Sequence, residues 1–150
     1  MLKLHQVIAS CAGIGYLKGG GTFAAILTCF CWYIFFPTIP NIFVTLAITI
    51  IIIVYGIWSG NVVEKWWGKD SSKVVLDEVA GMCVTLIAIP NKWEFVLVGL
   101  VLFRFFDITK PLFIKKLETL SGGKGVMFDD VLAGIYANLL LQIIVAVTNL

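Results

Sequence analysis

The longest charge-free stretch of the chain, Gly19–Val63, reads GGGTFAAILTCFCWYIFFPTIPNIFVTLAITIIIIVYGIWSGNVV. A helix of about 20 residues crosses the hydrocarbon core of a membrane, so this stretch is long enough for two such helices. Pro37 and Pro40 divide it, because proline lacks a backbone donor and disfavours helical geometry in the residue before it. The stretch therefore predicts one membrane-spanning helix near Thr22–Phe36 and a second near Asn41–Trp58.

The composition of the whole chain also indicates a membrane protein. Of its 150 residues, 60% are hydrophobic and 13% are charged, whereas soluble domains are about 45–50% apolar and about 25% charged. This composition excludes a disordered chain, a fibrous protein and a soluble enzyme. The net charge of +2 gives no reason to expect a nucleic-acid partner. We expect one membrane-embedded domain that occupies residues 1–150.

Three further apolar segments extend the helical pattern. Val131–Leu150 is charge-free and long enough to span, whereas Val79–Asn91 and Phe95–Phe103 are shorter and meet near Pro90. The shorter segments predict a helical hairpin that is tilted or packed against neighbouring helices. Strands are the weaker alternative, because the segments lack a period of two and an open sheet edge cannot face lipid. The predicted fold is all-α: a small polytopic helical membrane protein with about five membrane-embedded helices plus short interfacial helices.

Two segments predict the interfacial helices. Residues 1–17 include the apolar run Val7–Tyr16, which is too short to span and is typical of an interfacial or re-entrant helix. Trp66 and Trp67 lie close to lysines, and tryptophan is enriched at the headgroup level of membranes. We expect a second short helix there.

The basic residues are distributed unevenly in this arrangement. Five spans place Met1–Gly21, Ser59–Leu76 and Asp107–Asp130 on one side of the membrane, and only Lys92 among the basic residues lies on the other side. Because basic residues are enriched in cytoplasmic loops, the first side is predicted to be cytoplasmic. Its ten basic residues are Lys3, Lys18, Lys65, Lys69, Lys73, Arg104, Lys110, Lys115, Lys116 and Lys124.

Five carboxylates from three separate segments fall at this same cytoplasmic level. They are Asp77, Glu78, Asp107, Asp129 and Asp130. Carboxylates gathered at one depth repel one another and are costly wherever water is excluded, so a divalent cation is expected to offset their charge. Carboxylate and water oxygens suit Mg²⁺, which commonly shares its coordination with substrate phosphates.

Basic residues at the same level indicate an anionic, phosphate-bearing substrate. They are Lys18, Arg104, Lys110 and Lys124. Two simpler interpretations remain open at this point. Acidic residues at helix N-termini stabilise the helix dipole without any metal, and Arg104 with Asp107 has the spacing of an intrahelical ion pair.

Four short motifs follow one another along the chain: KGGGTFAA at Lys18–Ala25, DEVAG at Asp77–Gly81, RFFDITKP at Arg104–Pro111 and GGKGVMFDDVLAG at Gly122–Gly134. The last motif predicts a flexible glycine loop that leads into a helix with paired acids. In this order, and over Lys18–Leu140, the motifs resemble those of the phosphatidylglycerophosphatase A family. The first motif departs from that family's Lys-x-Pro-Gly-Thr-x-Gly-Ser pattern, because glycine replaces its proline and two alanines replace its Gly-Ser pair.

This resemblance implies a Mg²⁺-dependent lipid phosphatase of the bacterial inner membrane, multi-pass, with its active site facing the cytoplasm. It would hydrolyse phosphatidylglycerophosphate to phosphatidylglycerol and inorganic phosphate. A metal-activated water is the expected nucleophile, with one carboxylate as general base, and an aspartyl-phosphate intermediate remains open. The implied catalytic and metal residues are Asp77, Glu78, Asp107, Asp129 and Asp130. The implied substrate-binding residues are Lys18, Thr22, Arg104, Lys110 and Lys124.

Two alternative functions compete with this prediction. A CDP-alcohol phosphotransferase also uses clustered aspartates, but its spaced aspartate pattern does not occur in the chain. A transport or channel subunit would need polar groups through the depth of the membrane, whereas no predicted span has a charged residue near its middle. Gly81, Gly99 and Gly134 permit close helix packing within or between chains, so a homo-oligomer stays open, and membrane lipids are expected neighbours.

Overall fold

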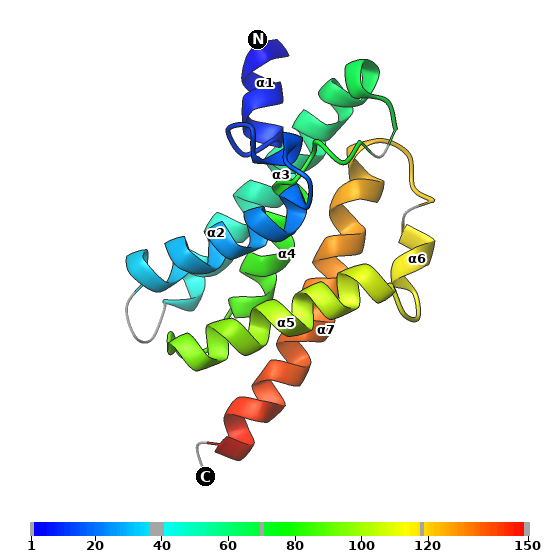
Figure 1. Cartoon of the computed structure of the whole chain (residues 1–150). Helices are drawn as coiled ribbons and strands as arrows, with labels where there is room; N and C mark the ends of the chain where they lie inside the picture. The colour runs from blue at the N-terminus through cyan, green and yellow to red at the C-terminus, as the bar shows by residue number, and fades with distance from the viewer. Residues whose placement is uncertain (1, 37–40, 70, 118, 149–150) are drawn as a thin grey trace.

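The computed structural model describes residues 2–36, 41–69, 71–117 and 119–148, and these residues form helices and no strand. The predicted all-α class is therefore confirmed. In chain order the helices are α1 (Leu2–Ala9), a 3-10 turn (Ile14–Tyr16), α2 (Gly20–Phe35), α3 (Ile42–Trp67), α4 (Leu76–Leu86), α5 (Trp93–Thr109), α6 (Ile114–Leu117) and α7 (Gly123–Thr148) (Figure 1).

Helix α4 forms the centre of the bundle. It packs against α2, α3, α5 and α7, and nearly all of its residues are buried. A helix that is apolar around most of its circumference is stable only when other helices surround it. Met82 and Leu86 of α4 accordingly join Phe103 of α5 and Leu141 of α7 in the main hydrophobic core.

The number of membrane spans differs from the prediction. Among the described helices, α3 and α7, with 26 residues each, are long and apolar enough to cross a membrane, so five spans are not supported. Helix α2 is apolar but has 16 residues. Helix α4 has 11 residues, and at 1.5 Å per residue it reaches about 16 Å, roughly half of the hydrocarbon thickness.

The second predicted span is longer than expected. Helix α3 continues nine residues beyond Trp58, so Trp66 and Trp67 form its last turn rather than a separate interfacial helix. The prediction of a separate interfacial helix was wrong because the helix continues without a break through Gly60 to Trp67. In the structure this glycine lies where a Cβ would approach the backbone of Gly123 to 2.9 Å, so it serves close helix contact. The helix ends at Gly68, which has a φ of 86°.

The predicted flexible glycine loop is also wrong, because helix α7 begins at Gly123. A Cβ on Gly123 would overlap the carbonyl of Ile57 on α3. The Oδ1 atom of Asn61 accepts a hydrogen bond of 2.8 Å from the Gly123 amide, one of the amides that a helix N-terminus otherwise leaves without a partner. Gly60 and Gly123 therefore allow the N-terminus of α7 to lie in direct contact with α3.

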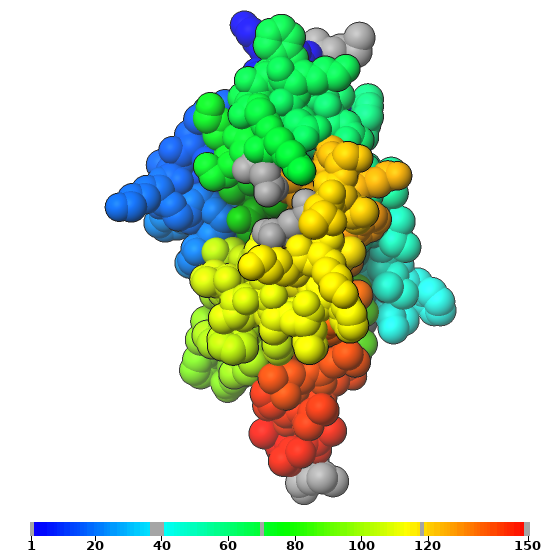
Figure 2. Space-filling view, turned by 90° about the vertical axis from the view of Figure 1, so that its right-hand side faces the viewer, coloured from blue at the N-terminus to red at the C-terminus, as the bar shows by residue number. Residues whose placement is uncertain are grey.

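The ends of the helices separate into two groups. In Figure 1, α1, the end of α3 and the start of α7 lie toward the top, whereas the ends of α2 and α7 and the turn between α4 and α5 lie lower. The C-terminal part of α7 protrudes beyond the other helices (Figure 2). Its Leu139, Ile143 and Val147 are exposed and apolar, as expected for a surface that faces lipid.

Candidate active site

Two glycines bring α4 and α7 into close contact. A Cβ on Gly81 would lie 2.7 Å from the carbonyl oxygen of Asp130, and a Cβ on Gly134 would overlap the carbonyl of Gly81. Gly81 lies one turn after Asp77, and Gly134 lies one turn after Asp130. The close crossing therefore places the two acidic pairs beside each other, and these glycines serve packing within one chain.

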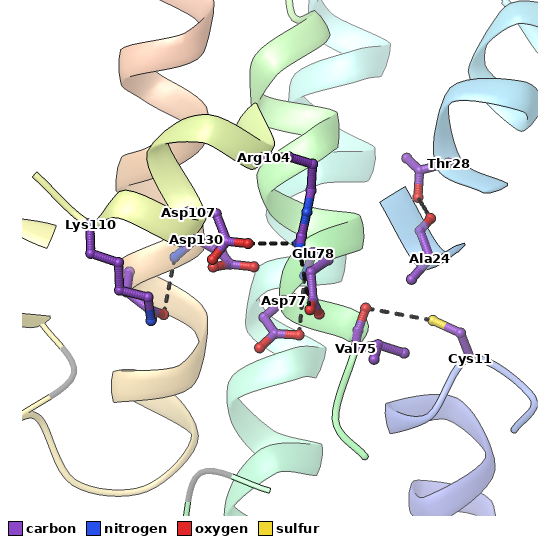
Figure 3. A network of polar contacts seen from close by, with 11 residues as sticks. Cys11, Ala24, Thr28, Val75, Asp77, Glu78, Arg104, Asp107, Lys110 and Asp130 are labelled. Carbon is purple, nitrogen blue, oxygen red and sulfur yellow. Dashed lines mark hydrogen bonds and ion pairs between the residues drawn. The ribbon is translucent and has the colours of Figure 1, made fainter. Parts of the chain in front are cut away.

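Three carboxylates meet at this crossing. Oxygen atoms of Asp77, Glu78 and Asp130 all lie within 4.8 Å of one another. Figure 3 shows these three side chains grouped together. Asp77 exposes 9% of its surface and Asp130 exposes 4%. Carboxylates this close and this buried strongly disfavour simultaneous ionisation unless a positive charge lies among them.

Two basic side chains, Arg104 on α5 and Lys110 directly after that helix, reach the carboxylates. The Arg104 guanidinium lies 2.6 Å from Asp107 Oδ2 and 3.9 Å from Glu78 Oε1, so it connects two helices and is more than an intrahelical pair. Lys110 Nζ donates a 2.7 Å hydrogen bond to Asp129 Oδ2. Lys110 ends α5 with a φ of 43°, a left-handed conformation that non-glycine residues adopt at an energetic cost and that is enriched at functional sites.

The carboxylates and Lys110 line one polar cavity of about 230 Å³, whereas Arg104 is not part of its lining. All five predicted carboxylates contribute to it, together with Lys110. Ser71 and Ser72 also line the cavity, and the sequence did not lead us to expect them. The sequence did contain one indication of them: they are two consecutive hydroxyl residues just before the helix that carries the first acidic pair.

Three of the predicted substrate-binding residues lie elsewhere. Lys18, Thr22 and Lys124 are exposed and do not line the acidic cavity. The N-terminal motif approaches the cavity through backbone instead, because a Cβ on Gly21 would overlap Glu78 Oε1. Contacts of these three side chains with substrate stay predictions.

The two acidic pairs differ in their distance from the N-terminus of the helix that carries them. Asp77 and Glu78 lie in the first turn of α4, where the dipole favours negative charge. Asp129 and Asp130 lie about two turns into α7, whereas the dipole effect falls off within the first turn. The simpler dipole interpretation therefore does not explain the second pair.

The electrostatics of the cavity fit a divalent cation. Burial, and then the neighbouring charge of Glu78, raises the pKa of the Asp77 carboxyl well above its ordinary value. Glu78 Oε2 is buried and has no hydrogen-bond partner among the described residues. Buried carboxylate oxygens that lack donors are the ligands that a hard cation such as Mg²⁺ prefers.

Comparison with known proteins identifies the family. The family model described as Phosphatidylglycerophosphatase A matches residues 7–145. A Bacteroides thetaiotaomicron protein named "Putative phosphatidylinositol-3-phosphatase" is 40% identical over 129 residues, which cover 82% of this chain and 81% of that protein. Proteins named Phosphatidylglycerophosphatase A from Haemophilus influenzae and Escherichia coli are 49% and 43% identical over 70 and 68 residues. Those alignments cover 45% and 44% of this chain and 43% and 40% of the relatives.

No solved structure matches the chain. The family model covers most of the sequence, including all four motifs and the helices that build the acidic cavity. The resemblance predicted from the motifs is confirmed, and the chain belongs to the phosphatidylglycerophosphatase A family, a family of phosphatases.

Proposed function

We propose that this protein is a Mg²⁺-dependent lipid phosphatase that hydrolyses phosphatidylglycerophosphate to phosphatidylglycerol and inorganic phosphate. The observation that carries the proposal is the meeting of Asp77, Glu78 and Asp130, whose oxygens lie within 4.8 Å of one another, in a cavity that Lys110 also lines. Such a cavity combines ligands for a cation with a positive side chain for a phosphate.

The residues of the cavity have distinct proposed roles. Asp77, Glu78 and Asp130 would hold Mg²⁺, which when bound supplies Lewis-acid neutralisation of phosphate charge and a more acidic water. Lys110, held 2.7 Å from Asp129, is placed to bind a phosphate oxygen. Arg104 positions Glu78 and Asp107 through its two ion pairs.

The proposed reaction is hydrolysis of a phosphate monoester. Water oxygen forms a bond to phosphorus as the bond between phosphorus and the glycerol oxygen breaks. One of the cavity carboxylates accepts a proton from the water, and this proton is then passed to the glycerol oxygen, which leaves as a hydroxyl. The acidic cavity has room for the phosphate, and a lipid tail must lie outside it.

The location of the cavity supports a cytoplasmic active site in a bacterial inner membrane. Most basic residues of the chain lie in the segments around the cavity, whereas Lys92 lies at the turn between α4 and α5. Because basic residues are enriched on the cytoplasmic side, the proposed orientation places the phosphate group of the substrate at that face.

Metal dependence is tested by phosphate release from phosphatidylglycerophosphate in vesicles that contain the purified protein. We expect release with Mg²⁺, loss of release with excess EDTA, and recovery when Mg²⁺ is restored. Unchanged release in EDTA would contradict the metal assignment. Phosphatidylinositol-3-phosphate should be assayed in parallel, because the Bacteroides relative bears that lipid phosphatase name. A higher kcat/KM on that lipid would reassign the substrate without changing the site.

Replacement of Lys110 by methionine is expected to lower kcat/KM by about 10²-fold, the effect typical of losing one group that stabilises transition-state charge. Methionine keeps much of the side chain's length and removes its charge. Lys116→Met, at an exposed position of α6, is the matched control and should stay close to the parent activity. Equal activities of the two variants would remove Lys110 from the proposed phosphate site.

A further inference from the structure

An apolar groove of about 300 Å³ lies between α2 and α3. Both helices pack against α4, and within the described residues they make few contacts with each other. The space between α2 and α3 is therefore open, and α4 forms its floor. Its lining includes Leu27 and Phe35 from α2, Ile48 and Ile52 from α3, and Cys83 from α4.

The chemistry of this groove suits hydrocarbon. The hydroxyl of Thr28, a polar side chain in the lining, already donates a 2.8 Å hydrogen bond to the carbonyl of Ala24. Trp32 and Phe36, which also line the groove, stack with their ring centroids 4.4 Å apart. An ion or a polar headgroup would lose its hydration here without gaining partners, whereas an acyl chain would gain dispersion contacts.

One end of the groove lies beside the acidic cavity. Val79 lines the groove and directly follows Glu78, which lines the cavity. Cys11 lies at the same end, with its Sγ atom 3.9 Å from the carbonyl of Val75. In the close view Cys11 and Thr28 lie on the side of Glu78 that faces away from Lys110 (Figure 3).

The groove is also open toward the surface that we expect to face lipid. Leu27, Phe35 and Ile48 line it and expose 43%, 78% and 37% of their surfaces. A lipid can therefore enter sideways from the bilayer, with its phosphate moving toward the cavity and one chain moving into the groove.

We propose that this groove holds one acyl chain of the lipid substrate while the phosphate of that lipid occupies the acidic cavity. The inference rests on the proposed function and adds to it the way in which the lipid is aligned. An acyl chain in a bilayer is already surrounded by hydrocarbon, so the groove contributes little transfer free energy. The groove instead orients the phosphate relative to the residues of the acidic cavity. The rate of hydrolysis depends steeply on this orientation.

A second apolar groove provides an internal comparison. It has a volume of about 340 Å³ and lies between α2 and α5, where Ile26, Phe30, Trp93 and Leu97 contribute to its lining. None of its lining residues is adjacent in sequence to a residue that lines the acidic cavity. Bulk lipid is sufficient to fill this second groove.

Neighbouring residues of α2 allow a matched test. Leu27 lines the first groove and Ile26 lines the second, and their exposed fractions are 43% and 45%. Leu27→Trp is expected to lower kcat/KM on phosphatidylglycerophosphate by about tenfold through misplacement of the phosphate, and to leave hydrolysis of the water-soluble deacylated headgroup close to the parent value. Ile26→Trp is expected to leave both rates close to the parent values.

Cys31→Phe obstructs the first groove from a second position and should reproduce the effect of Leu27→Trp if that variant folds poorly. Equal effects of the Leu27 and Ile26 variants on the lipid would overturn the inference. So would equal losses on the lipid and on the deacylated headgroup, because the defect would then lie in the cavity.

A binding experiment separates this inference from the proposed function. Phosphatidylglycerophosphate with a photoreactive acyl chain should label the first groove in preference to the second, whereas phosphatidylcholine with the same chain should label both alike. Similar labelling of the two grooves by both lipids would overturn the inference. Because labelling needs no hydrolysis, preferential labelling of the first groove without any phosphate release would contradict the proposed function alone.

Discussion

Replacement of Asp130 by asparagine is expected to lower kcat/KM for phosphate release by on the order of 10³-fold, the upper range for loss of one charge-stabilising group. Asp130 is buried, exposes 4% of its surface and shares the three-carboxylate cluster with Asp77 and Glu78. Asparagine preserves the shape of the side chain and removes its charge. Initial rates over a series of Mg²⁺ concentrations measure both the lost activity and the weaker dependence on the metal.

The same variant should remain folded. In the absence of metal, loss of one buried carboxylate removes repulsion within the cluster, so the thermal midpoint of the variant is expected to equal or exceed that of the parent. The increase in midpoint that Mg²⁺ gives the parent should become smaller in the variant. Glu94→Gln changes an exposed acid at the start of α5 and serves as the control. Parent-like Mg²⁺ dependence in the Asp130 variant would contradict the metal site.

Replacement of Gly134 by alanine is expected both to destabilise the protein and to disrupt the acidic cavity. A Cβ at this position would overlap the backbone of Gly81, so α4 and α7 must move apart. Overpacking of this kind costs about 1–3 kcal/mol, even though alanine favours a helix over glycine by about 1 kcal/mol. Because the displacement separates the Asp77 pair from the Asp130 pair, we expect kcat/KM to fall by about 10²-fold.

Thermal unfolding and phosphate release measure the two effects of the Gly134 variant. Gly99→Ala is the matched control on α5, since the Cβ there would lie 3.1–3.3 Å from the methyl ends of Leu141, Leu86 and Thr85. Those flexible side-chain ends can yield, whereas a carbonyl in a helix cannot. Parent-like activity and stability in the Gly134 variant would show that the close crossing does not position the carboxylates.

The positions of helices were predictable where their limits are local. Proline interrupts helical geometry through its own covalent structure, so the C-terminal end of α2 and the turn between α4 and α5 were expected close to their observed places. The outer ends of α4 and α5 were predicted less well, because α4 begins at Leu76 and α5 continues to Thr109. The positions of glycine residues relative to the helices were predicted less well. Gly123 and Gly125, which were predicted in a loop, belong to α7, and the close contact of Gly123 with α3 offsets its low helix propensity.

The sequence by itself determined the helical class, the apolar surface and the set of five acidic residues, because composition, periodicity and residue chemistry are local properties. Tertiary structure decided the rest. It gathered Asp77, Glu78 and Asp130 at a glycine crossing, added Ser71 and Ser72 to the cavity, and left Lys18 and Lys124 exposed. Side-chain proximity depends on how closely two helix backbones approach, and that distance is set by contacts between segments far apart in the chain.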